Sequence, residues 1–334
     1  MPNGLTGPDV RAVRLRAFGG ADVLRVEEVE DPEPGPGRAR IAVRAAGVHL
    51  VDTLVRRGGW ASPALPFTPG GEVAGVVDAV GPGVADDWLG RRVVTQLGLA
   101  SGGYAELAVR EVDALHVVPE GVGFPAAVAM VRTGSTALGV LDAAEPGPDD
   151  VVLVTAAAGG VGTLLVQGAA RAGAHVVGLT GCAGKRRAVL RAGAAVVVDY
   201  RREGWRSEVV EGLAGREVTA VLDGVGGAEG RGALDLLGPG GRLVMFGSSS
   251  GEPLDVSTSD LFARSLSAVT AVGPHVAKRA GGLRALEARA LAEAAARRWS
   301  PVVQEFPLAE AARAHAELEG RRTIGKVVLL PGDR

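Results

Sequence analysis

Cysteine is almost absent from this sequence of 334 residues, in which Cys182 stands alone. A single cysteine excludes an internal disulfide and any zinc site built from several thiolates, and it favours a reducing, cytoplasmic compartment. The five histidines are scattered along the chain, and no two of them have the spacing of a zinc site. We therefore expect no bound metal.

An excess of charge of either sign is also missing, since the formal net charge is -2. A nucleic-acid surface and a polybasic membrane anchor are therefore not expected. The uncharged stretch from Val151 to Ala170 is long enough to cross a bilayer, but four glycines, two threonines and Gln167 interrupt it. We interpret it as a strand, a turn and a helix inside an α/β domain, so no membrane partner is predicted.

The length of the chain suggests two domains. Short alternating segments separated by glycine and proline clusters recur between residues 11 and 109, and they predict a β-rich, barrel-like antiparallel domain. Beyond this region strand and helix patterns alternate, which predicts a parallel, doubly wound sheet that closes with a strand near Leu266 to Val272. The predicted domains are residues 1–125, residues 126–274, and a tail of residues 275–334 that rejoins the first domain.

A glycine-rich turn follows the apolar run at residues 151–154, in the pattern Ala157-x-Gly159-x-x-Gly162. Glycine lets the main chain approach a pyrophosphate closely, and the first N–H groups of the following helix then face the anion. The pattern therefore predicts a dinucleotide site, with a turn that binds no ligand as the alternative.

Acidic residues are missing between Asp150 and Asp199, although an NAD site places one about 20 residues after the turn to bind the ribose hydroxyls. The same interval contains five basic residues. Lys185, one of only three lysines, follows the Thr180-Gly181 turn, where a 2′-phosphate would need a cation. These features favour NADP(H), and the alternative is that residues 185–187 form a solvated helix face.

The sequence also lacks the Gly-x-Ser-x-Gly motif of a serine nucleophile, and Cys182 has no plausible partner near it in sequence. We therefore expect the cofactor to carry out the chemistry, while the protein supplies binding and orientation.

The order of these features resembles the medium-chain dehydrogenase/reductase superfamily, and within it the zinc-free quinone oxidoreductase (zeta-crystallin-like) branch. The resemblance covers nearly the whole chain after residue 10. It is carried by Ala45-Ala46-Gly47-Val48-His49-Leu50-Val51-Asp52-Thr53, Pro69-Gly70-Gly71-Glu72-Val73-Ala74-Gly75, Ala157-Ala158-Gly159-Gly160-Val161-Gly162 and Gly325-Lys326-Val327-Val328. The zinc-dependent branch would have a cysteine near position 47 and a histidine just before Glu72, where this chain has Gly47 and Gly71.

The resemblance implies a GroES-like β-rich catalytic domain, a Rossmann nucleotide domain and NADP(H) as cofactor. It assigns the pyrophosphate to the turn, the 2′-phosphate region to the residues around Lys185 with help from Tyr200 and Arg321, and the nicotinamide region to Thr133 and a loop after residue 245. The implied cofactor-binding residues are Thr133, Gly159, Gly160, Val161, Gly162, Thr180, Gly181, Lys185, Tyr200, Phe246, Gly247, Ser248 and Arg321.

Two positions depart from the family at the reactive end, where asparagine is usual at position 49 and tyrosine is frequent at position 54. This chain has His49 and Leu54. We assign His49, Asp52 and Thr133 to the mouth of the site, with His49 as a candidate proton donor or as a residue that only packs beside the cofactor.

The expected activity is zinc-independent hydride transfer from NADPH to a quinone or to the β-carbon of an activated alkene such as an enone. One alternative is an enoyl-thioester reductase of natural-product biosynthesis, and another is a non-catalytic NADPH-binding sensor or structural protein. The resemblance further implies a homodimer, which would pair through the edge strand near Leu266 to Val272.

Overall fold

The computed structural model describes residues 10–60, 62–98, 101–273, 278 and 281–332. The chain divides into two compact units, the first from Met1–Arg132 and Val303–Arg334 and the second from Thr133–Val302. The first unit is therefore discontinuous in sequence: one of its segments precedes the second unit along the chain, and the other follows it.

The first unit is built around a seven-stranded sheet in the order β14-β15-β3-β4-β5-β7, with β6 paired to β3, while β1 and β2 form a separate antiparallel pair. This arrangement confirms the predicted β-rich domain. Its elements are β1 (Val10–Leu15), β2 (Leu24–Val29), β3 (Arg38–Val48), α1 (Leu50–Arg56), β4 (Glu72–Val80), β5 (Arg92–Gln96), β6 (Leu107–Glu111), β7 (His116–Val117), α2 (Phe124–Val128), β14 (Val303–Pro307), α11 (Ala311–Glu319) and β15 (Lys326–Leu330).

Alternation along β3 produces the core of this unit. Ile41 and Val43 are buried, whereas Arg40 and Arg44, which precede and follow them, keep part of their surface in water. The buried side chains meet Val73 and those of other strands in one apolar cluster. A strand with period-two patterning of this kind buries one face and leaves the other polar.

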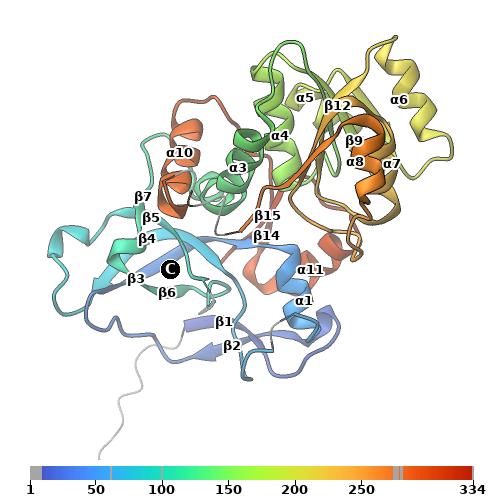
Figure 1. Cartoon of the computed structure of the whole chain (residues 1–334). Helices are drawn as coiled ribbons and strands as arrows, with labels where there is room; N and C mark the ends of the chain where they lie inside the picture. The colour runs from blue at the N-terminus through green and yellow to red at the C-terminus, as the bar shows by residue number, and fades with distance from the viewer. Residues whose placement is uncertain (1–9, 61, 99–100, 274–277, 279–280, 333–334) are drawn as a thin grey trace, which may run out of the picture. The chain divides into compact units, whose positions relative to one another are not determined.

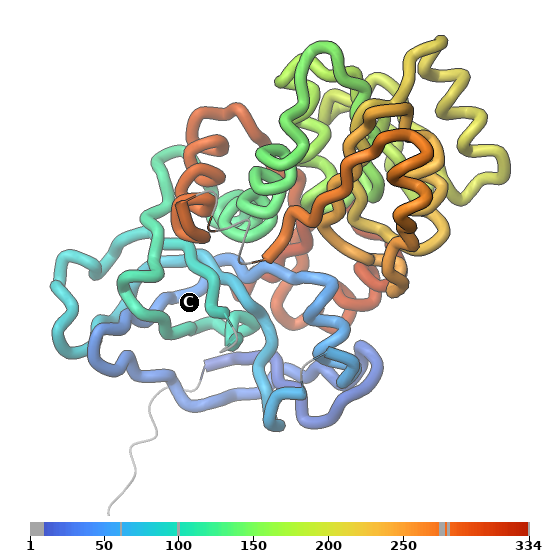
Figure 2. The backbone as a smooth tube through the Cα atoms, in the orientation of Figure 1, coloured from blue at the N-terminus to red at the C-terminus, as the bar shows by residue number. Residues whose placement is uncertain are grey.

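The end of the chain completes the sheet. Strand β15 runs antiparallel to β3, with Val327 opposite Val48 and Val328 opposite Gly47. The red C-terminal trace in Figure 2 returns in this way to the blue part of the chain. This register places Lys326 beside the carboxyl end of β3.

The second unit is a six-stranded parallel sheet in the order β10-β9-β8-β11-β12-β13 with helices between the strands, which confirms the predicted Rossmann fold (Figure 1). The order reverses between β8 and β11. Its elements are α3 (Ser135–Ala144), β8 (Val151–Val154), α4 (Gly160–Arg171), β9 (His175–Thr180), α5 (Arg186–Ala192), β10 (Val196–Asp199), α6 (Trp205–Leu213), β11 (Val218–Asp223), α7 (Gly227–Asp235), β12 (Leu237–Met245), α8 (Thr258–Arg264), β13 (Ser267–Thr270) and α10 (Leu283–Ala295).

The return to the first unit occurs at Val303, later than the predicted residue 275, and the first segment ends at Arg132 rather than at residue 125. The reason for the later return is helix α10, which packs against α3 of the second unit. Arg289 of α10 donates two hydrogen bonds to the carboxylate of Asp142 in α3, at 2.8 and 3.0 Å. The apolar pattern of α10 could not show which domain it would cover.

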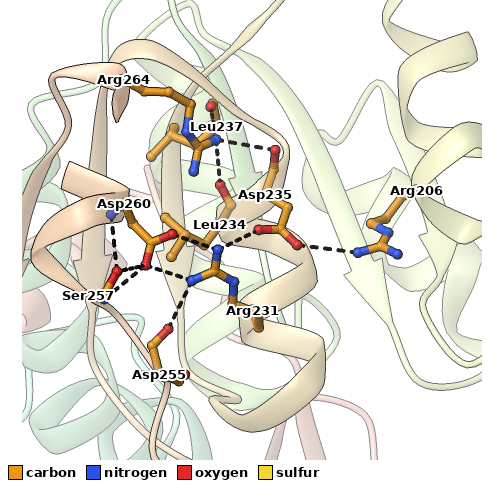
Figure 3. A network of polar contacts seen from close by, with 9 residues as sticks. All are labelled: Arg206, Arg231, Leu234, Asp235, Leu237, Asp255, Ser257, Asp260 and Arg264. Atoms are coloured by element: carbon orange, nitrogen blue, oxygen red, sulfur yellow. Dashed lines mark hydrogen bonds and ion pairs between the residues drawn. The ribbon is translucent and has the colours of Figure 1, made fainter. Parts of the chain in front are cut away.

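An arginine network joins the helices on one side of the second sheet (Figure 3). Arg231 of α7 donates to both carboxylate oxygens of Asp260 in α8, at 2.8 and 2.7 Å, and lies 3.0 Å from Asp235. Ser257 caps α8 by accepting the backbone N–H of Asp260. A bidentate arginine–carboxylate pair adds geometric specificity as well as binding energy, so this pair holds α7 against α8 in a defined orientation.

The helical run Phe124–Ala144 is long and apolar enough to cross a membrane by length and composition, and 67% of its window is buried in the protein. A core helix of a soluble protein passes the same test.

Candidate active site

The predicted phosphate turn joins β8 to α4 at the point where the strand order reverses. Ala156 adopts a left-handed conformation (φ 47°), and its carbonyl oxygen accepts the N–H of Gly159 at 2.8 Å. A Cβ at Gly162 would lie only 2.2 Å from that same carbonyl oxygen. Glycine is therefore required at position 162 for the helix to start this close to the strand.

The turn presents a helix N-terminus at the carboxyl edge of a parallel sheet. Gly159 is the N-cap residue, and Gly160 and Val161 open the first turn of α4. No side chain caps this end. The N–H groups of this first turn and the dipole of a 12-residue helix fit a pyrophosphate.

The predicted 2′-phosphate residues gather at the ends of β9 and β10. Thr180 closes β9 and accepts the N–H of Tyr200 at 3.0 Å. A Cβ at Gly181 would lie 2.8 Å from the hydroxyl oxygen of Tyr200, so that ring supports the turn from beneath. Lys185 follows at the N-cap of α5 and is partly exposed.

Arg201 is a cation at this edge that the sequence analysis missed. Its guanidinium approaches the carbonyl oxygen of Gly181 at 3.5 Å, and its backbone N–H donates to Asp199 at 3.0 Å. Arg186, by contrast, donates to the carbonyl oxygen of Val197 and is committed to joining α5 to β10. The signal for Arg201 in the sequence was its place two residues after the end of β10.

The predicted nicotinamide-side loop follows β12. Phe246 donates its backbone N–H to Asp223 at 2.8 Å, and Gly247 and Ser248 after it are exposed. Asp223 ends β11 with a fully buried side chain, which accepts the hydroxyl of Thr155 at 2.8 Å. This hydrogen bond joins the end of β11 to the residue that follows β8, beside the phosphate turn.

Two other predicted cofactor-binding residues, Thr133 and Arg321, belong to different units. Thr133 is the first residue of the second unit, and it is buried within a π-helical turn, Ala129–Gly134. Arg321 belongs to the first unit, where it is exposed and adopts a left-handed conformation (φ 54°) after α11. Cys182 is exposed.

In the first unit, His49 lies in a cluster with two buried charged residues that the sequence analysis did not assign to the site. Nε2 of His49 lies 2.7 Å from Oε1 of Glu72 and 2.7 Å from Nζ of Lys326. Lys326 and Glu72 are themselves 2.6 Å apart. The side chains of Glu72 and Lys326 are 0% and 4% exposed, whereas that of His49 is 18% exposed.

Burial and pairing act in opposite directions on these groups. Burial alone would raise the pKa of Glu72, but its contacts with His49 and Lys326 outweigh burial and lower the pKa to about 2. Burial lowers the pKa of Lys326 against the opposing attraction of Glu72. Burial also lowers the pKa of His49, so its imidazole is neutral near pH 7 beside an ionised carboxylate.

Asp52 faces the protein interior. Its Oδ2 accepts the backbone N–H of His49 at 2.8 Å and the hydroxyl of Tyr104 at 2.9 Å. The Tyr104 hydroxyl also lies 3.0 Å from Nε2 of His315, whose Nδ1 is 3.4 Å from Arg56. Burial and the Asp52 charge raise the pKa of Tyr104 well above its usual value. Asp52 thus fixes the backbone at His49 through a buried polar chain.

The residues of the first unit do not fit a catalytic zinc ion. A Cβ at Gly47 would lie 1.9 Å from Oε1 of Glu72, so the space for a cysteine side chain is occupied by that carboxylate. Within the described parts of the chain, no three His, Cys, Asp or Glu side chains are grouped to hold a metal. The residues of the second unit, in contrast, fit a phosphate-bearing dinucleotide.

Comparison with known proteins finds family matches for segments of both units. Residues 35–120 match the alcohol dehydrogenase GroES-like domain, and residues 192–329 match the zinc-binding dehydrogenase family. A quinone oxidoreductase of Pseudomonas aeruginosa is 36% identical over 327 residues, which cover 96% of this chain and 99% of that protein.

This chain belongs to the zinc-free quinone oxidoreductase branch of the medium-chain dehydrogenase/reductase superfamily. Another member, the Escherichia coli quinone oxidoreductase complexed with NADPH, superposes with a TM-score of 0.84 at 32% identity and covers 96% of this chain and 100% of that one. A 2-haloacrylate reductase from a Burkholderia species is 33% identical over 96% of this chain and 99% of its own length. The quinone oxidoreductase branch therefore includes relatives named for both quinones and an activated alkene.

Proposed function

We propose that this protein is an NADPH-dependent, zinc-independent oxidoreductase that transfers hydride to a quinone or to an activated alkene. The observation that carries the proposal is the β8–α4 turn, where the backbone at Gly162 approaches that of Ala156 too closely for any side chain. The names of the relatives, which include quinone oxidoreductases and a 2-haloacrylate reductase, support the choice of acceptors.

The residues of the second unit would hold NADPH along the carboxyl edge of the sheet. The N–H groups at Gly160 and Val161 would bind the pyrophosphate, because they open a helix with no side-chain cap. Lys185 and Arg201 would bind the 2′-phosphate, with Thr180, Gly181 and Tyr200 shaping that turn. Thr133, Phe246, Gly247 and Ser248 would bind the nicotinamide half. Arg321 is also assigned to the 2′-phosphate region, on the family resemblance.

When bound, the reduced nicotinamide supplies the hydride. An acceptor whose negative charge is delocalised over a ring or a carbonyl group needs no metal to stabilise it. His49 is proposed to contact the acceptor and to donate a hydrogen bond or a proton, since it is the most exposed member of its cluster. Asp52 is proposed to act as a positioning residue, because it holds the backbone N–H of His49.

A homodimer is proposed through β13. All four residues of this edge strand are exposed, and Val269 and Val272 expose 38% and 47% of their surface. An open edge strand can pair with a second copy of itself. Light scattering that gives the mass of one chain would contradict this assembly. The single cysteine and the weak net charge support a cytoplasmic enzyme without membrane or nucleic-acid partners.

The function is tested by mixing the purified protein with NADPH and a panel of benzoquinones, naphthoquinones, enones and acrylates, while the absorbance of NADPH is followed. We expect oxidation of NADPH with at least one acceptor class, and much slower oxidation of NADH. Treatment with a chelator should leave the rate unchanged. Tight NADPH binding without turnover on any acceptor would contradict the enzymatic proposal and would favour a binding protein.

A further inference from the structure

Two threonine–aspartate pairs link the neighbouring strands β8 and β11, one pair at each end of the strands. At the amino end, the hydroxyl of Thr219 donates to Oδ1 of Asp150 at 2.6 Å. At the carboxyl end, the hydroxyl of Thr155 donates to Oδ1 of Asp223 at 2.8 Å. The second pair therefore lies at the edge of the sheet that carries the phosphate turn.

The amino-end pair holds strands and the loop before them. The hydroxyl of Thr219 accepts the N–H of Val151 at 3.1 Å. Asp150 accepts the guanidinium of Arg242 in β12 at 2.8 Å and the N–H of Gly147 at 2.9 Å. Loss of the Thr219 hydroxyl would therefore weaken the packing at this end of the sheet and leave the carboxyl edge as it is.

The carboxyl-end pair fixes the turn that follows β11. The hydroxyl of Thr155 accepts the N–H of Gly224 at 2.9 Å. The fully buried carboxylate of Asp223 accepts the N–H groups of Val225 and Gly226, at 3.1 and 3.0 Å. Three successive backbone N–H groups are thus bound by one buried pair of side chains. Because a buried N–H without a partner is costly, this pair determines the path of the chain after β11.

The same turn holds the loop that follows β12. The carbonyl oxygens of Gly224 and Val225 accept the N–H groups of Ser249 and Ser250, at 3.0 and 2.9 Å. A Cβ at Gly224 would lie 2.4 Å from the ring of Phe246, so that ring rests against bare backbone. The loop after β12 therefore takes its position from the turn after β11.

The phosphate turn keeps its shape through other contacts. The N–H of Ala157 donates to the carbonyl oxygen of Leu179 in β9 at 2.9 Å. The N–H of Gly159 donates to Ala156 at 2.8 Å. Neither bond uses the side chain of Thr155, although Thr155 directly precedes this turn. Removal of the Thr155 hydroxyl should therefore release the turn after β11 and leave the phosphate turn in place.

We propose that Thr155 and Asp223 are positioning residues for NADPH, which hold the loop after β12 at a fixed place relative to the phosphate turn. This inference rests on the proposed function, in which that loop binds the nicotinamide half of the cofactor. Thr155 connects the two sides of the site, because its backbone continues into the phosphate turn and its hydroxyl binds Asp223. A site that is ordered before the ligand arrives loses less conformational entropy on binding.

The test compares Thr155→Val with Thr219→Val, since each replaces a hydroxyl by a methyl group in a link between the same two strands. Titrations give the Kd of NADPH and of adenosine 2′,5′-bisphosphate, which is the adenosine end of the cofactor without the nicotinamide. For Thr155→Val we expect the Kd of NADPH to rise about tenfold and that of the bisphosphate to change by less than about twofold. For Thr219→Val we expect both constants to match the wild type.

Thr155→Ser keeps the hydroxyl and should restore NADPH binding. Equal weakening of both ligands in Thr155→Val, or an effect on NADPH no larger than that of Thr219→Val, would overturn the positioning role and leave the proposed function standing. Failure of the wild type to bind NADPH would contradict the proposed function, and the positioning role would fall with it.

A measurement on the wild type covers variants that fold poorly. Hydrogen exchange followed by NMR reports the backbone N–H groups of Gly224, Val225 and Gly226 in the protein without cofactor. Because Thr155 and Asp223 bind these groups, we expect them to exchange as slowly as the N–H groups of β11 itself. Exchange as fast as in an exposed loop would overturn the proposal that this turn is ordered before NADPH binds.

Discussion

A Cβ built on Gly47 would lie 1.9 Å from Oε1 of Glu72, the atom that also contacts His49 and Lys326. The absence of a side chain at position 47 is therefore what allows this carboxylate to reach its partners. The sequence pattern showed that a cysteine is missing at this position. The structure shows what fills the space.

Substitution Gly47→Ala should displace the Glu72 carboxylate and break the cluster. We expect the free energy of unfolding to fall by about 1–3 kcal/mol, the usual cost of overpacking, and acceptor turnover to fall while NADPH binding is kept. Urea unfolding and NADPH titration measure the two effects. Gly35→Ala is the matched control, since a Cβ at Gly35 has no atom within 4 Å. Equal behaviour of the two variants would contradict this role for Gly47.

Substitution Gly162→Val should disrupt the turn that is proposed to bind the pyrophosphate. The added side chain would begin 2.2 Å from the Ala156 carbonyl oxygen, so the first turn of α4 must move. We expect NADPH binding to weaken about tenfold or more, equivalent to ~1.4 kcal/mol, in a fluorescence titration. Gly147→Ala in the loop before β8 has its nearest neighbour 3.9 Å away and should bind normally.

Substitution Lys185→Ala should reduce the preference for NADPH over NADH. Hydrogen bonds to charged groups contribute about 1.5–3 kcal/mol, so we expect KM for NADPH to rise about 10- to 100-fold and KM for NADH to stay constant. Arg187→Ala removes an exposed charge two residues away and is the control. Arg201→Ala tests the cation that only the structure revealed. An unchanged cofactor preference in Lys185→Ala would remove that residue from the site.

Acid should destabilise the first unit through His315. Burial lowers the pKa of His315 from 6.5 to about 4, with Asp52 opposing and Arg56 assisting the shift. The unfolded chain binds a proton at His315 more readily than the folded protein does. The contribution of neutral His315 to the free energy of unfolding is therefore complete above pH 6.5 and is lost as the pH falls towards 4. The loss is about 3 kcal/mol. Urea unfolding across this range should show a steeper decline for the wild type than for His315→Gln, and parallel curves would contradict the assignment.

The phosphate turn could be predicted from the sequence because all its parts are local. An apolar strand, three glycines and a helix follow one another within residues 151–171, and the structure places them as β8, the turn and α4. The NADP(H) preference was inferred in a similar way, from the residue types between two neighbouring strands. Patterns of this kind depend on spacing along the chain, which a sequence shows directly.

The cluster at His49 could not be predicted in this way, because its members are far apart in the chain. Strand pairing places Val328 opposite Gly47 and Val73 opposite Ala46, and these two registers bring Lys326 and Glu72 to His49. Register depends on the packing of the whole sheet. The one local signal was a lysine at the start of an otherwise apolar strand, in a chain with three lysines.

The transfer of hydride from NADPH without a metal is tested most directly with NADPH that carries deuterium at the transferable position of the nicotinamide. The chelator-treated protein is supplied with this cofactor and an α-haloacrylate, and the product is analysed by mass spectrometry and NMR. The proposed mechanism predicts one deuterium at the β-carbon and hydrogen from water at the α-carbon. Loss of turnover after chelation, or product without deuterium at the β-carbon, would contradict it.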